Sequence, residues 1–130
     1  MDPFDSRSAQ LCIASTRAEY AGRHDEALSL SCQAWESAVD DIDACLAAHY
    51  VARYEPDPAE RLRWNQIALD RAEAAPPERV ADLMPSLIVN LGRAHEALGH
   101  ETDARRCFER AAELGLPHDP LGPDRLHSSP

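Results

Sequence analysis

Residues 49–54 hold the first set of side chains whose types could do chemistry. His49, Tyr50, Arg53 and Tyr54 fall within two turns of a predicted helix. A histidine beside tyrosines and an arginine could act as a general acid or base. The neighbouring sequence supplies no candidate nucleophile and no paired carboxylate. We therefore predict no catalytic residues and no enzyme activity, and we interpret the cluster as packing and groove-lining side chains.

A second set, His95-Glu96-Ala97-Leu98-Gly99-His100, is close to the helical zinc motif H-E-x-x-H. That motif needs histidines four residues apart, so that both rings project from one face of the helix. Here the histidines are five apart, and at about 100° per residue their side chains would diverge by about 140° around the helix axis. Gly99 is also expected to end the helix between them. We predict no metal site and no cofactor.

The four cysteines are widely spaced and form no C-x-x-C pair; they are Cys12, Cys32, Cys45 and Cys107. Each lies among apolar neighbours on a predicted helix. This pattern predicts reduced thiols that pack as small hydrophobic side chains.

The charge balance excludes several classes of partner. There are 23 acidic residues against 13 basic residues, and the net charge of -10 repels phosphate backbones and anionic membrane surfaces. We therefore predict no nucleic-acid and no membrane partner. All 13 basic residues are arginine, a usage typical of GC-rich bacterial genomes such as those of actinobacteria. Without lysine, the chain can form neither a Schiff base nor a phosphate-loop contact through that residue.

The first residues, MDPFDSRSAQ, contain acids and a proline rather than a basic region followed by an apolar core. No apolar run along the chain reaches the length of a membrane span. We therefore expect a cytoplasmic protein.

The apolar residues recur with helical spacing, and none of the segments alternates strictly as a strand would. With 130 residues, 44% hydrophobic content and only 5% aromatic residues, the composition favours one all-α domain packed through small side chains. We predict helices over 6–21, 24–39, 42–54, 58–75, 85–98 and 101–115, with a short helical piece over 78–84. A single kinked helix through the prolines at 76, 77 and 85 is the alternative for that piece.

The ends of the predicted helices carry recognisable signals. Ser6 can cap the first helix, and Gly22 can end it in the left-handed conformation. Asp57 can cap the fourth helix, with Pro58 in its first position and Glu60 reaching back as in a capping box.

The stretch from Ile88 to Pro117 resembles a tetratricopeptide repeat. It reads as two antiparallel helices joined at Gly99-His100, and it carries the family's pattern in order: Leu91, Gly92, Ala104, Phe108, Ala111 and Pro117. The resemblance implies an α-α superhelix of about three helical hairpins over residues 1–115, followed by an irregular, proline-rich tail over 116–130.

Equivalent alanines relate the three predicted hairpins. Ala34, Ala68 and Ala111 are separated by 34 and 43 residues, so the second step carries an insertion of about nine residues beyond the family's period. The middle repeat diverges most, with His49 where the pattern has glycine and Arg61 where it has alanine.

The resemblance implies a concave groove lined by the first helix of each hairpin. Arg53 and Arg93 could bind a carboxylate as planar forks. Asn90 stands where family members that bind chaperone tails carry a clamp asparagine, although the lysines of that clamp have no equivalent here. The groove residues predicted in this way are Thr16, Glu19, Tyr20, Tyr50, Arg53, Tyr54, Val89, Asn90, Arg93 and Glu96.

Three functions are compatible with this pattern. The first is an interaction module, or adaptor, that binds a peptide or protein segment with an acidic or carboxylate end in the groove. The second is a small-molecule anion binder or accessory enzyme that uses the same groove. The third is a structural homo-oligomer. A deep closed pocket favours the second, and a channel along all three hairpins favours the first.

The last hairpin has apolar residues on both faces and no repeat after it. We predict that residues 116–127 cover its outer face, or that two copies meet there as a symmetric homodimer.

Overall fold

The structure of the chain, a computed structural model, describes residues 6–115. This part is all-α. Its helices are α1 (Arg7–Tyr20), α2 (His24–Glu36), α3 (Asp41–Tyr54), α4 (Pro58–Ala74), α5 (Pro77–Val80), α6 (Met84–Ala97) and α7 (Glu101–Glu113). The predicted all-α fold is thereby confirmed. The tail over 116–130, with its predicted contact against the last hairpin, lies outside the described residues.

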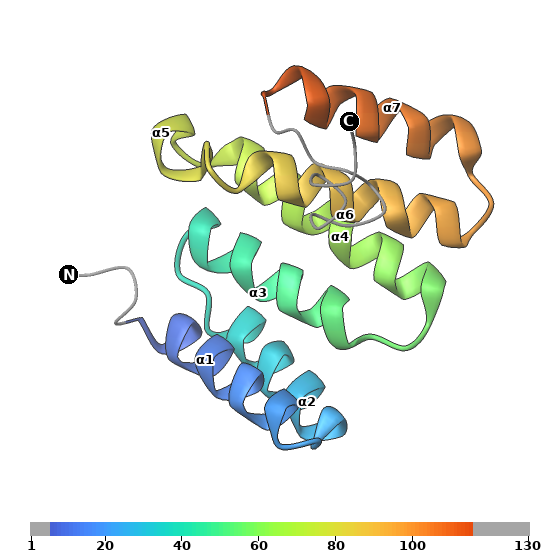
Figure 1. The fold of residues 1–130 in the computed structure, drawn as a ribbon. Helices are drawn as coiled ribbons and strands as arrows, with labels where there is room; N and C mark the ends of the chain where they lie inside the picture. Colours follow the sequence, from blue (N-terminus) through green and yellow to red (C-terminus); the bar gives the residue numbers. More distant parts are fainter. Residues whose placement is uncertain (1–5, 116–130) are drawn as a thin grey trace.

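The helices form three antiparallel hairpins, α1–α2, α3–α4 and α6–α7, which lie side by side in chain order (Figure 1). The second hairpin packs against the first through α3, which contacts both α1 and α2. It packs against the third through contacts between α4 and α6. Within residues 6–115 the main contacts of each hairpin are therefore with its neighbours along the chain, as in a helical repeat array.

Local signals account for several helix ends. The Ser6 hydroxyl accepts a hydrogen bond from the Ala9 amide at 3.0 Å, and the Asp40 carboxylate accepts one from the Asp43 amide at 2.8 Å. Gly22 and Gly99 both adopt φ of 79°, the left-handed conformation that ends α1 and the α6 segment. These residues satisfy backbone groups that the helix ends would leave unpaired.

Two predictions about helix ends were wrong. The second helix ends at Glu36 rather than Val39, and the Asp57 side chain makes no capping hydrogen bond. Glu60 instead pairs with Arg63 at 3.0 Å, so no capping box forms at the start of α4. The insertion holds the predicted separate helical piece, but only Pro77–Val80 is α-helical, and α6 begins at Met84.

The core is built largely from alanine, which lets neighbouring helices approach closely. Ala27, Ala34, Ala47, Ala48 and Ala68 are fully buried. Buried apolar residues form two clusters, one around α3, α4 and α6 and a smaller one between the first two hairpins.

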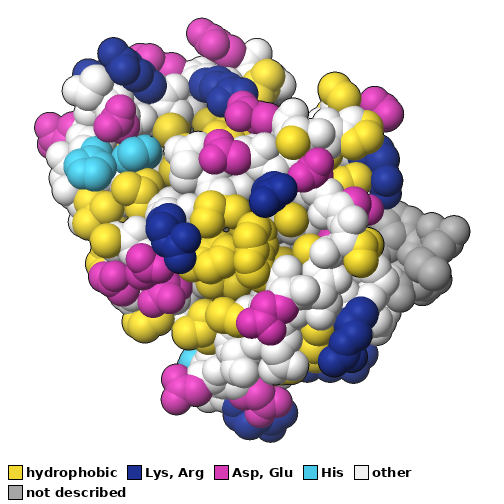
Figure 2. Space-filling view, turned by 180° about the vertical axis from the view of Figure 1, so that it is seen from behind, with side chains coloured by type: hydrophobic (Ala, Val, Ile, Leu, Met, Phe, Trp, Pro, Cys, Tyr) yellow, Lys and Arg dark blue, Asp and Glu magenta, His cyan; other side chains and the backbone are white. Residues whose placement is uncertain are grey.

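Two tryptophans in contact with each other connect these two clusters. Trp35 of α2 packs against both clusters and meets Trp64 of α4 edge to face, with ring centroids 5.1 Å apart. Arg63 stacks over Trp64, and Arg71 lies over Trp35. The face seen from behind carries a central patch of hydrophobic side chains bordered by arginines and acids (Figure 2). Both tryptophans thus pack between helices.

Among the helices of residues 6–115, none combines the length and the apolar character needed to cross a bilayer.

Candidate anion-binding pocket

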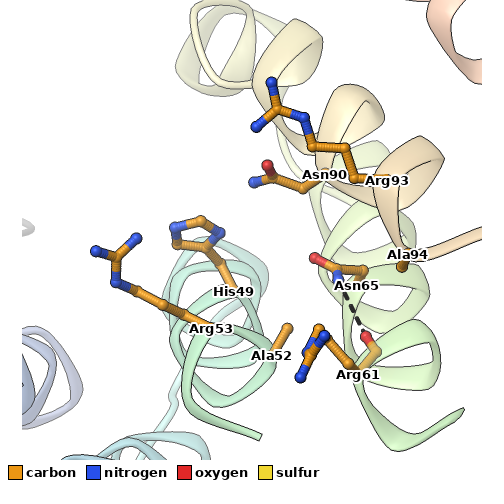
Figure 3. Close-up of a pocket in the computed structure, with 8 residues that line it drawn as sticks. All are labelled: His49, Ala52, Arg53, Arg61, Asn65, Asn90, Arg93 and Ala94. Atoms are coloured by element: carbon orange, nitrogen blue, oxygen red, sulfur yellow. Dashed lines mark hydrogen bonds between the residues drawn. The ribbon is translucent and has the colours of Figure 1, made fainter. Parts of the chain in front are cut away.

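A cavity of about 310 Å³ lies where the middle hairpin meets α6. Helices α3, α4 and α6 each contribute side chains to its wall (Figure 3). The lining residues are His49, Ala52, Arg53, Arg61, Asn65, Asn90, Arg93 and Ala94. In Figure 3, Arg53 of α3 and Arg93 of α6 stand on opposite sides of the cavity, with His49 and the two asparagines between them.

The cavity occurs where the middle hairpin departs from its neighbours. In the last hairpin Gly92 lies directly against Phe108, so that a Cβ atom on Gly92 would come within 2.8 Å of the Phe108 ring. The corresponding residues of the middle hairpin, 43 positions earlier, are His49 and Asn65. Arg61 likewise replaces the buried Ala104. Polar side chains thus occupy positions that elsewhere close a helix pair.

The first hairpin resembles the last in this respect. Its equivalent residues, 34 positions before those of the middle hairpin, are Ser15, Ala27 and Ser31, and all three are fully buried. The two serine hydroxyls donate to helix carbonyls of their own turns, those of Cys12 and Leu28. Small side chains therefore close the first hairpin, and Gly92 and Ala104 with the Phe108 ring close the last, whereas the set of histidine, arginine and asparagine is specific to the middle one.

Hydrogen bonds to the backbone hold two of the lining residues. The Arg61 guanidinium donates to the carbonyls of Glu55 and Pro56 in the α3–α4 turn, at 3.0 to 3.2 Å. The Asn65 amide nitrogen donates to the Arg61 carbonyl at 3.0 Å, which leaves its side-chain oxygen directed toward the cavity (Figure 3). Because carbonyls carry no formal charge, these bonds position Arg61 without neutralising it.

Arg53 is held by a carboxylate of the first hairpin. Its Nε and Nη2 atoms donate to the two oxygens of Glu19 at 3.0 and 2.9 Å, and the Tyr54 hydroxyl donates to the same carboxylate at 3.1 Å. The hydrogen bond from Arg53 is the main reason that the pKa of Glu19 lies below its usual value. This bidentate pair fixes the direction of the guanidinium at the edge of the cavity.

His49 is a half-buried polar group of the site. Burial lowers its pKa below the usual 6.5, and the nearby Arg53 charge lowers it further. Its Nδ1 atom is buried and has no hydrogen-bond partner among the described residues. The ring packs edge to face on Tyr50, with centroids 5.0 Å apart. A neutral imidazole with an unused nitrogen therefore lines the cavity near neutral pH.

The electrostatic character of the cavity is opposite to that of the whole chain. Three guanidinium groups line it and none of its eight lining residues is acidic, with the Glu19 carboxylate paired to Arg53 from outside the lining, whereas the chain carries a net charge of -10. Arginine forks and asparagine amides are the donors that bind carboxylates and phosphates in proteins. This arrangement can hold an anionic group.

The predicted groove residues fall into separate places. Arg53, Asn90 and Arg93 line the cationic cavity. An apolar cavity of about 410 Å³ between α1 and α3 contains three others, namely Thr16, Tyr20 and Tyr50. Glu19 and Tyr54 lie at the contact between the first two hairpins, hydrogen-bonded to each other.

Two predicted groove residues lie elsewhere. Val89 is 2% exposed and belongs to the core cluster, so its side chain is not available to a ligand. Glu96 lines a depression with residues of α7, among them Ala104 and Phe108, rather than the cationic cavity. Helical spacing placed both on the groove stripe, but contacts of α6 with α4 and α7 decide which of its sides is covered.

Arg61 and Asn65 are polar lining residues that were not predicted as part of a site from the sequence. The sequence contains a feature that indicates each of them. Arg61 was recognised as a departure from the repeat pattern, and the same alignment puts Asn65 at the position of Phe108. A polar residue at a position that should fill a helix–helix contact indicates a cavity there.

The cysteines are free thiols in positions that do not favour reactivity. Burial raises the pKa of Cys12 and of Cys45 to about 11, and it also raises the pKa of the half-buried Cys32 and Cys107. Since the thiolate is the nucleophile, these residues act as small packing side chains at neutral pH.

The predicted divergence of His95 and His100 was wrong. Their Nδ1 atoms lie 3.1 Å apart and their ring centroids 5.3 Å apart. The two side chains would diverge around the helix axis only if the helix continued from His95 to His100. Here the chain reverses at Gly99, and the His100 amide donates back to the His95 carbonyl at 2.9 Å.

Comparison of the chain with protein-family models, with curated proteins and with solved structures gave no match.

Proposed function

We propose that this chain is an interaction module of the tetratricopeptide type, which binds a protein segment through an acidic side chain or a terminal carboxylate. The observation that carries the proposal is the polar replacement in the middle hairpin. His49, Arg61 and Asn65 stand where the last hairpin has Gly92, Ala104 and Phe108, and they line a cavity with Arg53 and Arg93. At these positions the middle hairpin carries polar side chains that bind an anion, in place of the side chains that close the last hairpin.

The surroundings of the cavity favour an extended ligand. Tyr50, whose ring contacts His49, also lines the apolar cavity between α1 and α3. That second cavity is bordered by Ile13 and by Tyr20, of which 39% and 86% are exposed. A segment with its carboxylate among the arginines and an apolar side chain against Tyr20 would use both cavities. Peptide recognition commonly combines a charged anchor with a neighbouring apolar contact.

A small-molecule anion is the second candidate. The cationic cavity draws its lining from the middle hairpin and α6 rather than from all three hairpins. A ligand of a few heavy atoms with one or two carboxylates would fit this volume of about 310 Å³ without reaching the apolar cavity.

Arginine substitutions test the proposal. A peptide selected from a library with free carboxyl ends should bind Arg61→Ala and Arg93→Ala each about 1–3 kcal/mol more weakly than the native chain, because a charged hydrogen bond is lost. Arg106→Ala, which removes an exposed arginine of α7, is the matched control and should bind as the native chain does. Isothermal titration calorimetry measures the affinities, and circular dichroism checks that helicity is kept.

Arg53→Ala should weaken binding as well, but it also releases the Glu19 carboxylate, just as Arg61→Ala releases the Glu55 and Pro56 carbonyls, so circular dichroism must show that each variant keeps its helicity. Unchanged affinity in the Arg61→Ala/Arg93→Ala double variant would contradict the anion site. The Tyr20→Ala variant distinguishes the two candidate ligands. It should bind an extended peptide more weakly than the native chain does and bind a small dicarboxylate equally well. Amidation of the peptide's carboxyl end distinguishes a terminal carboxylate from an acidic side chain.

A further inference from the structure

The α6–α7 turn brings two histidines together at the surface. Gly99 adopts φ of 79°, its amide donates to the Glu96 carbonyl at 3.0 Å, and the His100 amide donates to the His95 carbonyl at 2.9 Å. This six-residue closure is the Schellman pattern, which places its first and last side chains against each other. Figure 2 shows two histidine side chains in contact at the surface of the molecule.

The first hairpin makes the same turn without metal-binding side chains. Gly22 has the same φ of 79°, its amide donates to the Glu19 carbonyl, and the Arg23 amide donates to the Ala18 carbonyl at 2.8 Å. Ala18 and Arg23 therefore occupy the places of the two histidines. Because the turn forms equally well with those residues, the histidine pair is not required for the turn itself.

The geometry of the pair suits a divalent transition metal. Two imidazole nitrogens bound to one Zn²⁺ at about 2.0–2.1 Å in a tetrahedral site are about 3.3 Å apart. The His95 and His100 Nδ1 atoms are 3.1 Å apart. Asp103, in the first turn of α7, offers a carboxylate oxygen, and the three ligand atoms lie within 4.8 Å of one another.

We propose that His95, His100 and Asp103 form a zinc site that ties the end of α6 to the start of α7. His95 is half-buried, whereas the other two side chains are exposed, so neighbouring side chains leave the Asp103 carboxylate room to turn toward a bound ion. Two imidazoles and one carboxylate leave a fourth position for water or for a ligand from another molecule. The net charge of -10 favours capture of a cation.

The test is calorimetric titration of zinc sulfate into the full chain under a non-chelating reductant. One Zn²⁺ should bind per chain and raise the melting temperature, because the metal binds the folded hairpin. His95→Ala and His100→Arg reproduce the residues of the first hairpin's turn, so both should fold. Each should lose at least about tenfold in zinc affinity, since substitution even of groups that only orient a metal ligand costs that much. Asp103→Asn should bind more weakly than the native chain.

Two controls separate this site from other zinc ligands. His24→Ala removes an exposed histidine of the first hairpin, and a Cys32→Ser/Cys107→Ser variant removes the two half-buried thiols. Both should keep the native affinity. Native-like zinc binding by His95→Ala or His100→Arg would overturn the proposal, as would the absence of any zinc binding by the native chain. Imidazole resonances in the NMR spectrum that shift with zinc, and that vanish in these two variants, would confirm the ligands directly.

Discussion

The middle and last hairpins share one backbone plan and differ in what fills the space between their helices. In the last hairpin Gly92 allows Phe108 to lie against the backbone of α6, and the buried Ala104 completes the contact. In the middle hairpin the same positions carry His49, Asn65 and Arg61, and a cavity lies beside them. The last hairpin is closed by packing, whereas the middle one exchanges part of that packing for polar groups.

This difference indicates how a helical array can hold a polar cavity without losing its fold. The middle hairpin is supported on both sides, by α1 and α2 on one and by α6 on the other. Its core still buries Cys45, Ala48 and Ala68 completely. A hairpin with two neighbours can lose a few internal contacts, whereas a terminal hairpin depends more on its own closure.

Removal of the Phe108 ring is the strongest way to test the closed hairpin. Phe108→Ala should lower the free energy of unfolding by about 3 kcal/mol, because it leaves a cavity beside Gly92. The matched substitution in the middle hairpin, Asn65→Ala, should cost about 1 kcal/mol or less, since it removes one hydrogen bond at a cavity wall. Urea unfolding followed by circular dichroism measures both.

Equal losses for the two variants would mean that the hairpins do not differ as described. A loss below about 1 kcal/mol for Phe108→Ala would show that the last hairpin is not closed by this ring.

Alanine substitution at Gly92, or at the equivalent His49 of the middle hairpin, should change the free energy of unfolding by a smaller amount. The change should be of opposite sign in the two hairpins. A Cβ atom at Gly92 would meet the Phe108 ring at 2.8 Å and the Cys107 Cβ at 3.0 Å. Gly92→Ala should therefore destabilise by about 1 kcal/mol, because overpacking of about 1–3 kcal/mol exceeds the gain in helix propensity. His49→Ala should be neutral or slightly stabilising, since it removes a buried nitrogen that has no partner.

Thermal unfolding of the two variants beside the native chain measures these changes. A stabilised Gly92→Ala variant would contradict the close approach of α6 and α7.

Protonation of His49 should produce the smallest effect. Its folded pKa lies below 6.5 because of burial and the Arg53 charge, while Arg61 from α4 and Arg93 from α6 also line its cavity. As pH falls below 6.5, the unfolded chain takes up this proton first, so stability decreases. His49→Ala should lose this part of the decrease between pH 6.5 and pH 5.

Urea midpoints at several pH values, compared between native chain and variant, measure the difference. A bound anion in the cavity would favour the protonated ring, so a ligand should bind more tightly at the lower pH. Identical pH profiles for variant and native chain would show that the ring is solvated and that the cavity is more open than described.

The sequence alone determined what depends on near neighbours along the chain. Helical periodicity predicted every long helix, Ser6 predicted the start of the first one, Gly22 and Gly99 predicted two helix ends, and the equivalent alanines predicted three hairpins with an insertion. Such features follow from interactions over one or two turns, which residue types set directly. The sequence also marked the unusual middle hairpin, because His49 and Arg61 broke its pattern.

Only the tertiary structure decided which side chains meet. Val89 and Asn90 are consecutive on one helix, yet the first is buried in the core and the second lines the cavity, because α4 and α7 cover different sides of α6. The contact of His95 with His100 required the chain reversal at Gly99, since helical spacing had placed the rings apart. The cavity joins residues of three helices, so its composition depends on how two hairpins pack rather than on any single segment.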